Sequence, residues 1–211
     1  MSAVVVFGAG GHAKVVVDVL RSSGAEVLAC AVPSGGAGTI AGAPVIDEDA
    51  ADRLLDDGAG AFVAIGDNVL RSRIADRLRG GGRQLVNAIS PTAYLAEDAV
   101  LGTGVLIAPN VAINAATRIG DDVIVNTGAT VDHDNVVGAA AHIAPGCHLA
   151  GDVHVGRRAF LGVGTAVIPG IRIGDDALVG AGSVVIRDVE AGARAWGNPA
   201  RPGRREGSEV E

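Results

Sequence analysis

Aliphatic residues recur at every sixth position through the second half of the chain. The row begins at Ile89 and ends at Val185, and each of its seventeen positions is Leu, Ile or Val. A second row, made almost entirely of small or β-branched residues, lies two positions before the first and begins at Ala93. A period of six matches neither an amphipathic helix nor an alternating strand, and it is typical of hexapeptide-repeat parallel β-helices. The pattern therefore predicts a β-helix whose triangular coils each contain three hexads, with the aliphatic side chains inside.

The first 88 residues have a different pattern, in which short apolar runs alternate with amphipathic segments. The predicted strands are 4–7, 26–31, 43–46 and 61–65. The predicted helices are 48–55, 68–78 and 13–20, the last with an apolar face at Val15, Val16, Val19 and Leu20. Such alternation favours a parallel sheet covered by helices. We therefore expect an α/β Rossmann-like domain over 1–88, an all-β parallel β-helix over 89–190, and a C-terminal segment over 191–211 that ends in a solvated tail.

Composition narrows the classes of function. The net charge of −7 argues against a nucleic-acid-binding surface. The two cysteines, Cys30 and Cys147, lie far apart, which favours a reducing compartment over a disulfide framework. The sequence shows neither a signal peptide nor an apolar run long enough to span a membrane. We therefore expect a cytoplasmic protein that binds no nucleic acid and no membrane.

A glycine-rich turn follows the first predicted strand. Gly8, Gly10 and Ala13 match the spacing of a dinucleotide fingerprint, and backbone N–H groups at the start of the next helix could hold a phosphate. A dinucleotide enzyme also needs an acidic residue at the end of its second strand, and this chain has none at 30–33. The turn therefore favours a mononucleotide or a nucleotide-sugar phosphate, with Lys14 and Arg71 as nearby cations.

A second loop, formed by Gly66, Asp67 and Asn68, lies at the carboxyl end of another predicted strand. Ligands of open α/β sheets bind at this edge. The polar residues could equally cap the helix that follows. The sequence leaves ligand contact and capping open, and both can hold together.

Four of the five histidines lie in the predicted β-helix, so a metal site has to be considered. His142, His148 and His154 are spaced by single hexads, which places them on three successive faces of the coil. They cannot converge on one ion within a chain, and we predict no metal site. His148 and His154 are expected to be solvated surface residues.

His133 is the strongest candidate for chemistry. It lies two positions after the inward Val131, so it points outward, and Asp132 and Asp134 flank it. A carboxylate beside an imidazole orients the ring and stabilises its protonated form, as a general base requires. Gly151 follows His133 by three hexads, which is one full coil, and its backbone N–H could stabilise an oxyanion there.

Five motifs together resemble a known family. They are VVFGAGGHAKVV at 5–16, VAIGDN at 63–68, VNT at 125–127, VDHD at 131–134 and GNPA at 197–200. In this order they resemble the NeuD/PglD-type bacterial sugar acyltransferases, and the resemblance spans residues 3 to about 202. It implies a left-handed β-helix, a homotrimer, acetyl-CoA as the donor co-substrate without a metal, and a small-molecule sugar as the acceptor.

The resemblance also implies roles for individual residues. His133 corresponds to the general base, Asp134 to its partner and Gly151 to the oxyanion donor. His142, Val163 and Ala181 correspond to acetyl-CoA contacts. The residues that correspond to the substrate-binding positions are Gly10, Gly11, His12, Gly66, Asp67, Asn68 and Asn126.

The expected reaction is direct transfer of an acetyl group from acetyl-CoA to the amino group of a nucleotide-linked amino sugar. O-acetylation of a sugar hydroxyl, such as one on sialic acid, is the alternative, because the same base and donor serve both reactions. A Rossmann oxidoreductase would need the missing ribose-binding acid. A structural or ice-binding β-helix would need a flat array of threonines, and none is present in the sequence.

Overall fold

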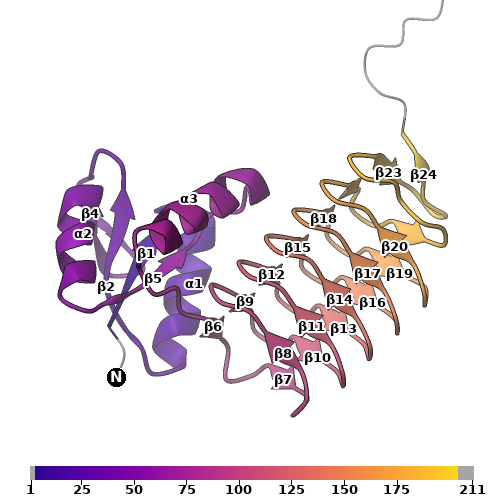
Figure 1. Cartoon of the computed structure of the whole chain (residues 1–211), viewed down its shortest axis with the longest axis horizontal. Coiled ribbons are helices and arrows are strands. Elements are labelled where there is room, and N and C mark those ends of the chain that lie inside the picture. Colours follow the sequence, from indigo (N-terminus) through magenta and orange to yellow (C-terminus); the bar gives the residue numbers. More distant parts are fainter. Residues whose placement is uncertain (1–2, 204–211) are drawn as a thin grey trace, which may run out of the picture.

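The computed structural model describes residues 3–203, which form an α/β domain followed by a long β-helix (Figure 1). The first domain has a five-stranded sheet in the order β3-β4-β2-β1-β5. Its strands are β1 (Ala3–Phe7), β2 (Glu26–Val32), β3 (Thr39–Ile40), β4 (Ala43–Asp47) and β5 (Gly60–Val63). Its helices are α1 (Gly11–Ser22), α2 (Glu48–Asp56) and α3 (Asn68–Gly80). The α/β class and the predicted elements are confirmed, with β3, which pairs antiparallel with β4, as an addition.

The buried face of α1 differs from the predicted apolar face at three positions. Val15 is 37% exposed, whereas Ala13 and Val17 join Val16, Val19 and Leu20 in the core. The prediction for Val15 is therefore wrong. In a run of three valines the periodicity alone does not decide which two face the sheet.

Three parallel sheets form the triangular β-helix. The eight-stranded face contains β6 (Ala88–Ile89), β9 (Leu106–Ile107), β12 (Ile124–Val125), β15 (His142–Ile143), β18 (Phe160–Leu161), β21 (Leu178–Val179), β23 (Arg194–Trp196) and β24 (Arg201–Pro202). The six-stranded face contains β7 (Tyr94–Leu95), β10 (Ala112–Ile113), β13 (Thr130–Val131), β16 (His148–Leu149), β19 (Ala166–Val167) and β22 (Val184–Val185). The five-stranded face contains β8 (Val100–Leu101), β11 (Arg118–Ile119), β14 (Val136–Val137), β17 (His154–Val155) and β20 (Arg172–Ile173).

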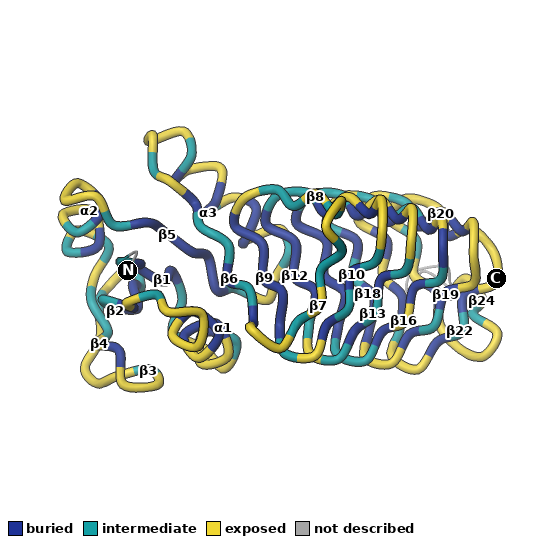
Figure 2. The backbone as a smooth tube through the Cα atoms, turned by 90° about the horizontal axis from the view of Figure 1, so that it is seen from below, coloured by how far each residue is buried: buried dark blue, intermediate teal, exposed yellow. Residues whose placement is uncertain are grey.

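The hexad row accounts for the coil pattern from Ile89 to Val185. From Ile89 to Val185 every predicted aliphatic is the second residue of a strand, and strands separated by three hexads pair in register, as Ile113 does with Val131. The buried rows run along the length of the β-helix (Figure 2). The predicted left-handed β-helix fold is confirmed.

The last coil breaks the period. Leu178 of β21 pairs with Arg194, which lies two positions short of the three-hexad repeat, and β24 then pairs antiparallel with β23. Stepping by six from Val185 therefore misses both strands, and the segment after 190 is more ordered than predicted. Most of the predicted solvated tail, residues 204–211, lies outside the described residues.

Three corners join the faces, and their positions locate the site. In the coil that starts at β12, the first corner is 126–129, between the eight- and six-stranded faces. The second corner is 132–135, between the six- and five-stranded faces, and the third corner is 138–141, which returns to the eight-stranded face. The α/β domain packs against the early coils of the eight-stranded face, where the outward residues Leu106 and Ile124 are buried.

Candidate active site

His133 and Asp134 form a pair on the second corner. The imidazole Nδ1 lies 2.8 Å from Asp134 Oδ2, and both side chains are exposed. Asp134 has a left-handed backbone, with φ of 60°, which turns its carboxylate back toward the preceding residue. The Asp132 carboxylate accepts a hydrogen bond from the His133 N–H at 2.9 Å and so fixes the backbone of the histidine.

The carboxylates around His133 favour its protonated form. The hydrogen bond to Asp134, together with the charges of Asp132, Asp134 and Asp152, raises the pKa of His133 above its ordinary value. Nδ1 is engaged by Asp134, and within residues 3–203 Nε2 forms no hydrogen bond. This arrangement suits a general base that takes a proton through Nε2.

Gly151 lies directly against the His133 ring, one coil further on. A Cβ at this position would lie 2.6 Å from Nε2 of the histidine, so no larger residue fits beside this ring position. The Gly151 N–H donates none of the backbone hydrogen bonds found in residues 3–203. The predicted stacking of Gly151 on His133 is therefore present, and within residues 3–203 the Gly151 N–H has no backbone acceptor.

A second group of predicted residues meets where the α/β domain contacts the eight-stranded face. His142, on β15, is only 8% exposed, and its Nε2 lies 3.3 Å from Asn126 Nδ2 on the first corner. His12, in the first turn of α1, has its ring centroid 6.3 Å from that of His142. Within the described part of the chain, His12 Nε2 and His142 Nδ1 are buried without a hydrogen-bond partner. The two rings are therefore neighbours, and each keeps one buried nitrogen without a partner in residues 3–203.

Burial keeps these two histidines neutral. Burial, reinforced by the charge of Arg71, lowers the pKa of His12 to about 4. The pKa of His142 is lowered to about 4 by burial and then by Arg71 and His12, against a smaller opposing effect of the Gly66 backbone. Neutral imidazoles can accept or donate hydrogen bonds, and they add no positive charge to the site.

In the loop after β5, the side chains of Asp67 and Asn68 both have structural roles. Asp67 caps α3, since its Oδ1 accepts a hydrogen bond from Leu70 N at 2.7 Å. Asn68 donates through Nδ2 to the carbonyl oxygen of Arg158 at 2.9 Å, which ties the loop to the β-helix. Capping by Asp67 is thus confirmed, and Gly66 remains the most open part of this loop for a ligand.

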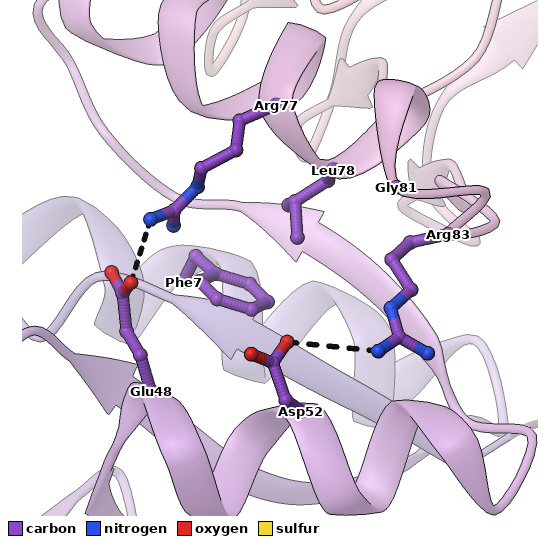
Figure 3. A pocket seen from close by; sticks show the side chains of 7 residues that line it. All are labelled: Phe7, Glu48, Asp52, Arg77, Leu78, Gly81 and Arg83. Atoms are coloured by element: carbon purple, nitrogen blue, oxygen red, sulfur yellow. Dashed lines mark hydrogen bonds and ion pairs between the residues drawn. The ribbon is translucent and has the colours of Figure 1, made fainter.

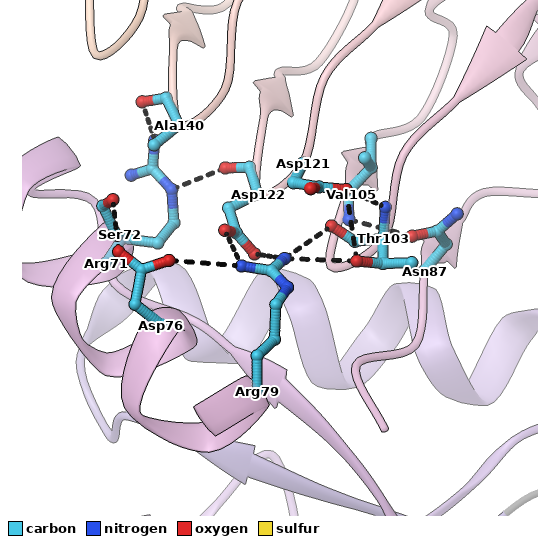
Figure 4. Close-up of polar contacts among 10 residues, drawn as sticks. All are labelled: Arg71, Ser72, Asp76, Arg79, Asn87, Thr103, Val105, Asp121, Asp122 and Ala140. Carbon is cyan, nitrogen blue, oxygen red and sulfur yellow. Dashed lines mark hydrogen bonds and ion pairs between the residues drawn. The ribbon is translucent and has the colours of Figure 1, made fainter. Parts of the chain in front are cut away.

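Arg71 differs most from its predicted role. Instead of lying near a phosphate site as a free cation, it is 1% exposed, and carbonyl oxygens and one amide oxygen take up its N–H groups (Figure 4). A sequence signal existed: Arg71 lies on the same helical stripe as Ser72, Ala75 and Leu78, which is the buried side of α3. Lys14 remains exposed on α1.

Val163 and Ala181 lie at equivalent places on successive first corners. Both are exposed, Val163 at 55%, and the Gly182 N–H donates to the Val163 carbonyl oxygen, so the two coils are in register. They continue the column of corners that contains Asn126. A single chain does not bring this column to His133, because the six-stranded face separates the first corner from the second.

The predicted turn at the start of α1 is open. Gly10 is the N-cap of α1 and Gly11 its first residue, and a Cβ at either position would meet nothing within 4 Å. The N–H groups of a helix start attract anions. Gly10, Gly11 and His12 therefore form one open turn that leads toward His142.

A cavity of about 250 Å³ lies elsewhere, between α2 and α3. Its lining includes Phe7, and ion pairs join Arg77 to Glu48 at 2.7 Å and Arg83 to Asp52 at 3.9 Å across it (Figure 3). None of the predicted site residues lines it, and its charged groups are paired with each other.

His148 and His154 are on the surface as expected. His148 shares a hydrogen bond of 2.9 Å with the Thr130 hydroxyl, and His154 lies 3.5 Å from Asp152. Among residues 3–203, no group of three or more histidine, cysteine or acidic side chains is placed to hold a metal ion. In the same range, no helix has the length and apolarity needed to cross a membrane.

Comparisons with known proteins give a consistent result. The PglD N-terminal domain family matches residues 3–78, and the hexapeptide repeat of succinyl-transferase matches residues 152–187. The chain is 47% identical to perosamine N-acetyltransferase from Caulobacter crescentus, whose histidine-to-asparagine variant was solved with CoA and GDP-perosamine. That match covers 97% of this chain and 98% of the other, with a TM-score of 0.93.

Two further solved structures are similar over nearly their whole length. The acetyltransferase domain of PglB from Neisseria gonorrhoeae, in complex with acetyl coenzyme A, is 33% identical over 95% of this chain and 98% of its own, with a TM-score of 0.90. WeeI from Acinetobacter baumannii is 27% identical over 96% of this chain and 100% of its own, with a TM-score of 0.88. An uncharacterised protein of Acanthamoeba polyphaga mimivirus is 30% identical over 113 residues, and this match spans only 22% of the viral protein. With its α/β domain, its hexapeptide β-helix and these near full-length matches, the chain belongs to the NeuD/PglD-type family of acetyl-CoA-dependent sugar acetyltransferases.

Proposed function

We propose that the protein transfers the acetyl group of acetyl-CoA to the amino group of a nucleotide-linked amino sugar. The observation that carries the proposal is the His133–Asp134 pair at 2.8 Å, packed against Gly151, in a chain 47% identical to an enzyme solved with GDP-perosamine. An amine attacks a thioester directly, so the protein needs a base and an oxyanion donor and no covalent enzyme intermediate.

The roles follow from the geometry of the second corner. His133 Nε2 takes the proton that the amine loses as it attacks the thioester carbonyl carbon, while Asp134 holds the ring and stabilises the imidazolium. The free N–H of Gly151 donates to the oxyanion of the tetrahedral intermediate. Collapse of that intermediate breaks the C–S bond and releases CoA, whose thiolate receives the proton from His133.

We assign the binding of the acceptor sugar and of acetyl-CoA to the residues of the α/β domain and of the first corners. The open turn of Gly10, Gly11 and His12 binds the diphosphate, helped by the start of α1. The loop at 66–68, together with Asn126 and the neutral His142, surrounds the sugar and the acetyl group. The column of Val163 and Ala181 forms an apolar wall for the pantetheine arm of acetyl-CoA.

A homotrimer is part of this proposal, because the two groups occupy different corners of one chain. Rotation of a neighbour about an axis parallel to the β-helix brings its first corner to the second corner of this chain. The six-stranded face would then line the axis, and its outward residues in the middle coils are mostly small: Ala112, Thr130 and Ala166. Three chains related in this way give three identical sites.

We also place the protein in the cytoplasm. Both thiols, Cys30 and Cys147, are free and buried, which suits a reducing compartment.

A thiol-release assay tests the function. Purified protein is incubated with acetyl-CoA and a panel of acceptors that contains GDP-perosamine, several UDP-amino sugars and sialic acids. We expect CoA release with a nucleotide-linked amino sugar and an N-acetylated product by mass spectrometry. Release with sialic acid alone, and an O-acetylated product, would make O-acetylation the function instead.

A further inference from the structure

The buried guanidinium of Arg71 has an unusual environment. Its Nε donates to the carbonyl oxygen of Asp122 at 2.8 Å, and Nη2 donates to that of Ala140 at 2.7 Å and to Asn68 Oδ1 at 2.8 Å. Nη1 donates to the carbonyl oxygen of Ile65 at 2.9 Å. No carboxylate within residues 3–203 forms an ion pair with it, and burial lowers the pKa of Arg71 to about 10.

Packing alone would favour an apolar side chain over the charged Arg71 at this buried position. Removing a charged group from water carries a large free-energy penalty, and a well-packed apolar residue often gives equal or greater stability. A planar guanidinium does supply five N–H donors in fixed directions. The side chain is therefore suited to holding several backbone segments in one arrangement.

The oxygen atoms that accept hydrogen bonds from Arg71 come from both domains. Asp122 and Ala140 occupy equivalent third corners of successive coils, and both have left-handed backbones, with φ of 58° and 55°. Asn68 extends the contact to the next third corner through the carbonyl oxygen of Arg158. The loop at 65–68 is thus fastened to three successive coils of the β-helix.

The hydrogen bonds of Arg71 also involve neighbours of the residues that we assign to the acceptor sugar. Ala140 and Ala141 directly precede His142, and the Ala141 carbonyl oxygen lies 3.3 Å from Nη2 of Arg71. Ile65 directly precedes Gly66, whose carbonyl oxygen lies 3.3 Å from Nη1. A single side chain therefore sets the position of the 66–68 loop relative to His142.

We propose that Arg71 is the positioning residue of the acceptor pocket, holding the 66–68 loop of the α/β domain against the strand that carries His142. It acts without touching either substrate. The inference rests on the proposed function for its kinetic test, because it concerns where the acceptor sugar is held relative to acetyl-CoA.

A matched control lies on the same helix. Arg79 also joins α3 to the β-helix, through two hydrogen bonds of 2.7 Å to the carboxylate of Asp122 (Figure 4). Arg79 lies two turns of α3 further from the 66–68 loop than Arg71 does. It contacts none of the residues that we assign to the acceptor sugar. Arg79→Met therefore weakens domain docking without releasing the loop.

The experiment compares Arg71→Met, Arg71→Lys and Arg79→Met. For Arg71→Met we expect kcat/KM for the nucleotide sugar to fall about 100-fold, the effect of a small misplacement of a bound reactant, while the affinity for CoA by calorimetry stays within about 3-fold. Arg71→Lys keeps a cation with three donors and should lose less. Arg79→Met should lower the melting temperature and leave kcat/KM for the nucleotide sugar within about 3-fold of wild type.

Hydrogen exchange provides a readout that does not depend on turnover. In Arg71→Met we expect faster exchange in peptides that cover 65–68 and unchanged exchange in coils beyond 160. If Arg71→Met does not fold, the same comparison is made with Arg71→Lys. Unchanged exchange at 65–68, or an equal fall of kcat/KM for the nucleotide sugar in Arg79→Met, would overturn the inference. A wild-type enzyme that acetylates no nucleotide sugar would contradict the proposed function, and exchange would still decide the role of Arg71.

Discussion

Histidines of this chain differ in chemistry because their surroundings differ. His133 is exposed next to carboxylates, which raise its pKa. His142 is buried and His12 is half-buried, and burial together with the nearby charge of Arg71 lowers the pKa of both to about 4. His133 therefore favours its protonated form, whereas the other two are neutral hydrogen-bonding groups. The sequence distinguished His133 through its acidic neighbours, but the burial of His142 depends on a domain contact that no local pattern reveals.

Replacement of His133 tests the assignment of the base. We expect His133→Ala to lower kcat by about 10²–10⁴, the usual contribution of a general base, with an unchanged melting temperature because the side chain points outward. Asp134→Asn should cause a smaller loss, because it only orients and polarises the ring. His154→Ala, on the five-stranded face away from the proposed trimer axis, is the control for removing a surface imidazole. Full activity of His133→Ala with the true acceptor would show that another group is the base.

The pH dependence of the reaction should reflect the same pair. The base must be unprotonated to act, and Asp134 raises the pKa of His133, so kcat/KM should rise with pH and reach half its maximum above 6.5. Asp134→Asn removes the charge that stabilises the imidazolium, and the midpoint should move to lower pH. Profiles of both proteins with the same acceptor provide the comparison, since the amine of the sugar titrates equally in each. An unmoved midpoint would contradict the role of Asp134.

At the scale of elements, periodicity predicted most of the fold. The row from Ile89 to Val185 predicted every strand from β6 to β22, because each side of a triangular coil contains one inward aliphatic residue. The pattern failed where geometry changes: β23 and β24 follow a coil that falls two positions short of three hexads. The alternation in the first 88 residues predicted the sheet and helices, yet it could not show that Arg71 faces the β-helix instead of a ligand.

The turn that begins α1 carries the prediction for nucleotide binding. A Cβ at Gly11 meets nothing within 4 Å, so Gly11→Val should fold normally while its side chain fills the space of the diphosphate. We expect calorimetric binding of nucleoside diphosphates to be lost and CoA binding to be unchanged. Because no acidic residue follows β2 at Val32 or Pro33, wild type should discriminate poorly among UDP, GDP and dTDP. Tight binding of one nucleotide alone would contradict that expectation, and retained binding by Gly11→Val would place the diphosphate elsewhere.

At the scale of the whole molecule, the domain contact should make stability depend on pH. The folded chain keeps His12 and His142 neutral down to about pH 4, whereas the unfolded chain binds protons on both below about 6.5. The unfolded state then carries more protons, so the free energy of unfolding falls as the pH falls from 6.5 toward 4, by up to about 3 kcal/mol per histidine. Denaturant titrations across this range measure the slope, and His142→Asn should reduce it. An equal slope in the variant would mean that His142 is not held neutral.

The arrangement of the corners implies that each active site combines the second corner of one chain with the first corner and α/β domain of another. His133→Ala inactivates the half formed by the second corner. Gly11→Val inactivates the half formed by the first corner and the α/β domain. Each variant should be inactive alone. If the two are unfolded together, mixed in equal amounts and refolded, random assembly into trimers restores both intact halves at about a quarter of the sites.

Subunit mixing is therefore the most direct measurement. With a nucleotide-linked amino sugar and acetyl-CoA, the mixture of His133→Ala and Gly11→Val should recover about a quarter of the activity of refolded wild type. A mixture of His133→Ala and Gly151→Ala, which damage the same half, should recover none. Activity no higher in the first mixture than in the second, although both reassemble to the mass of a trimer, would contradict a site shared between chains.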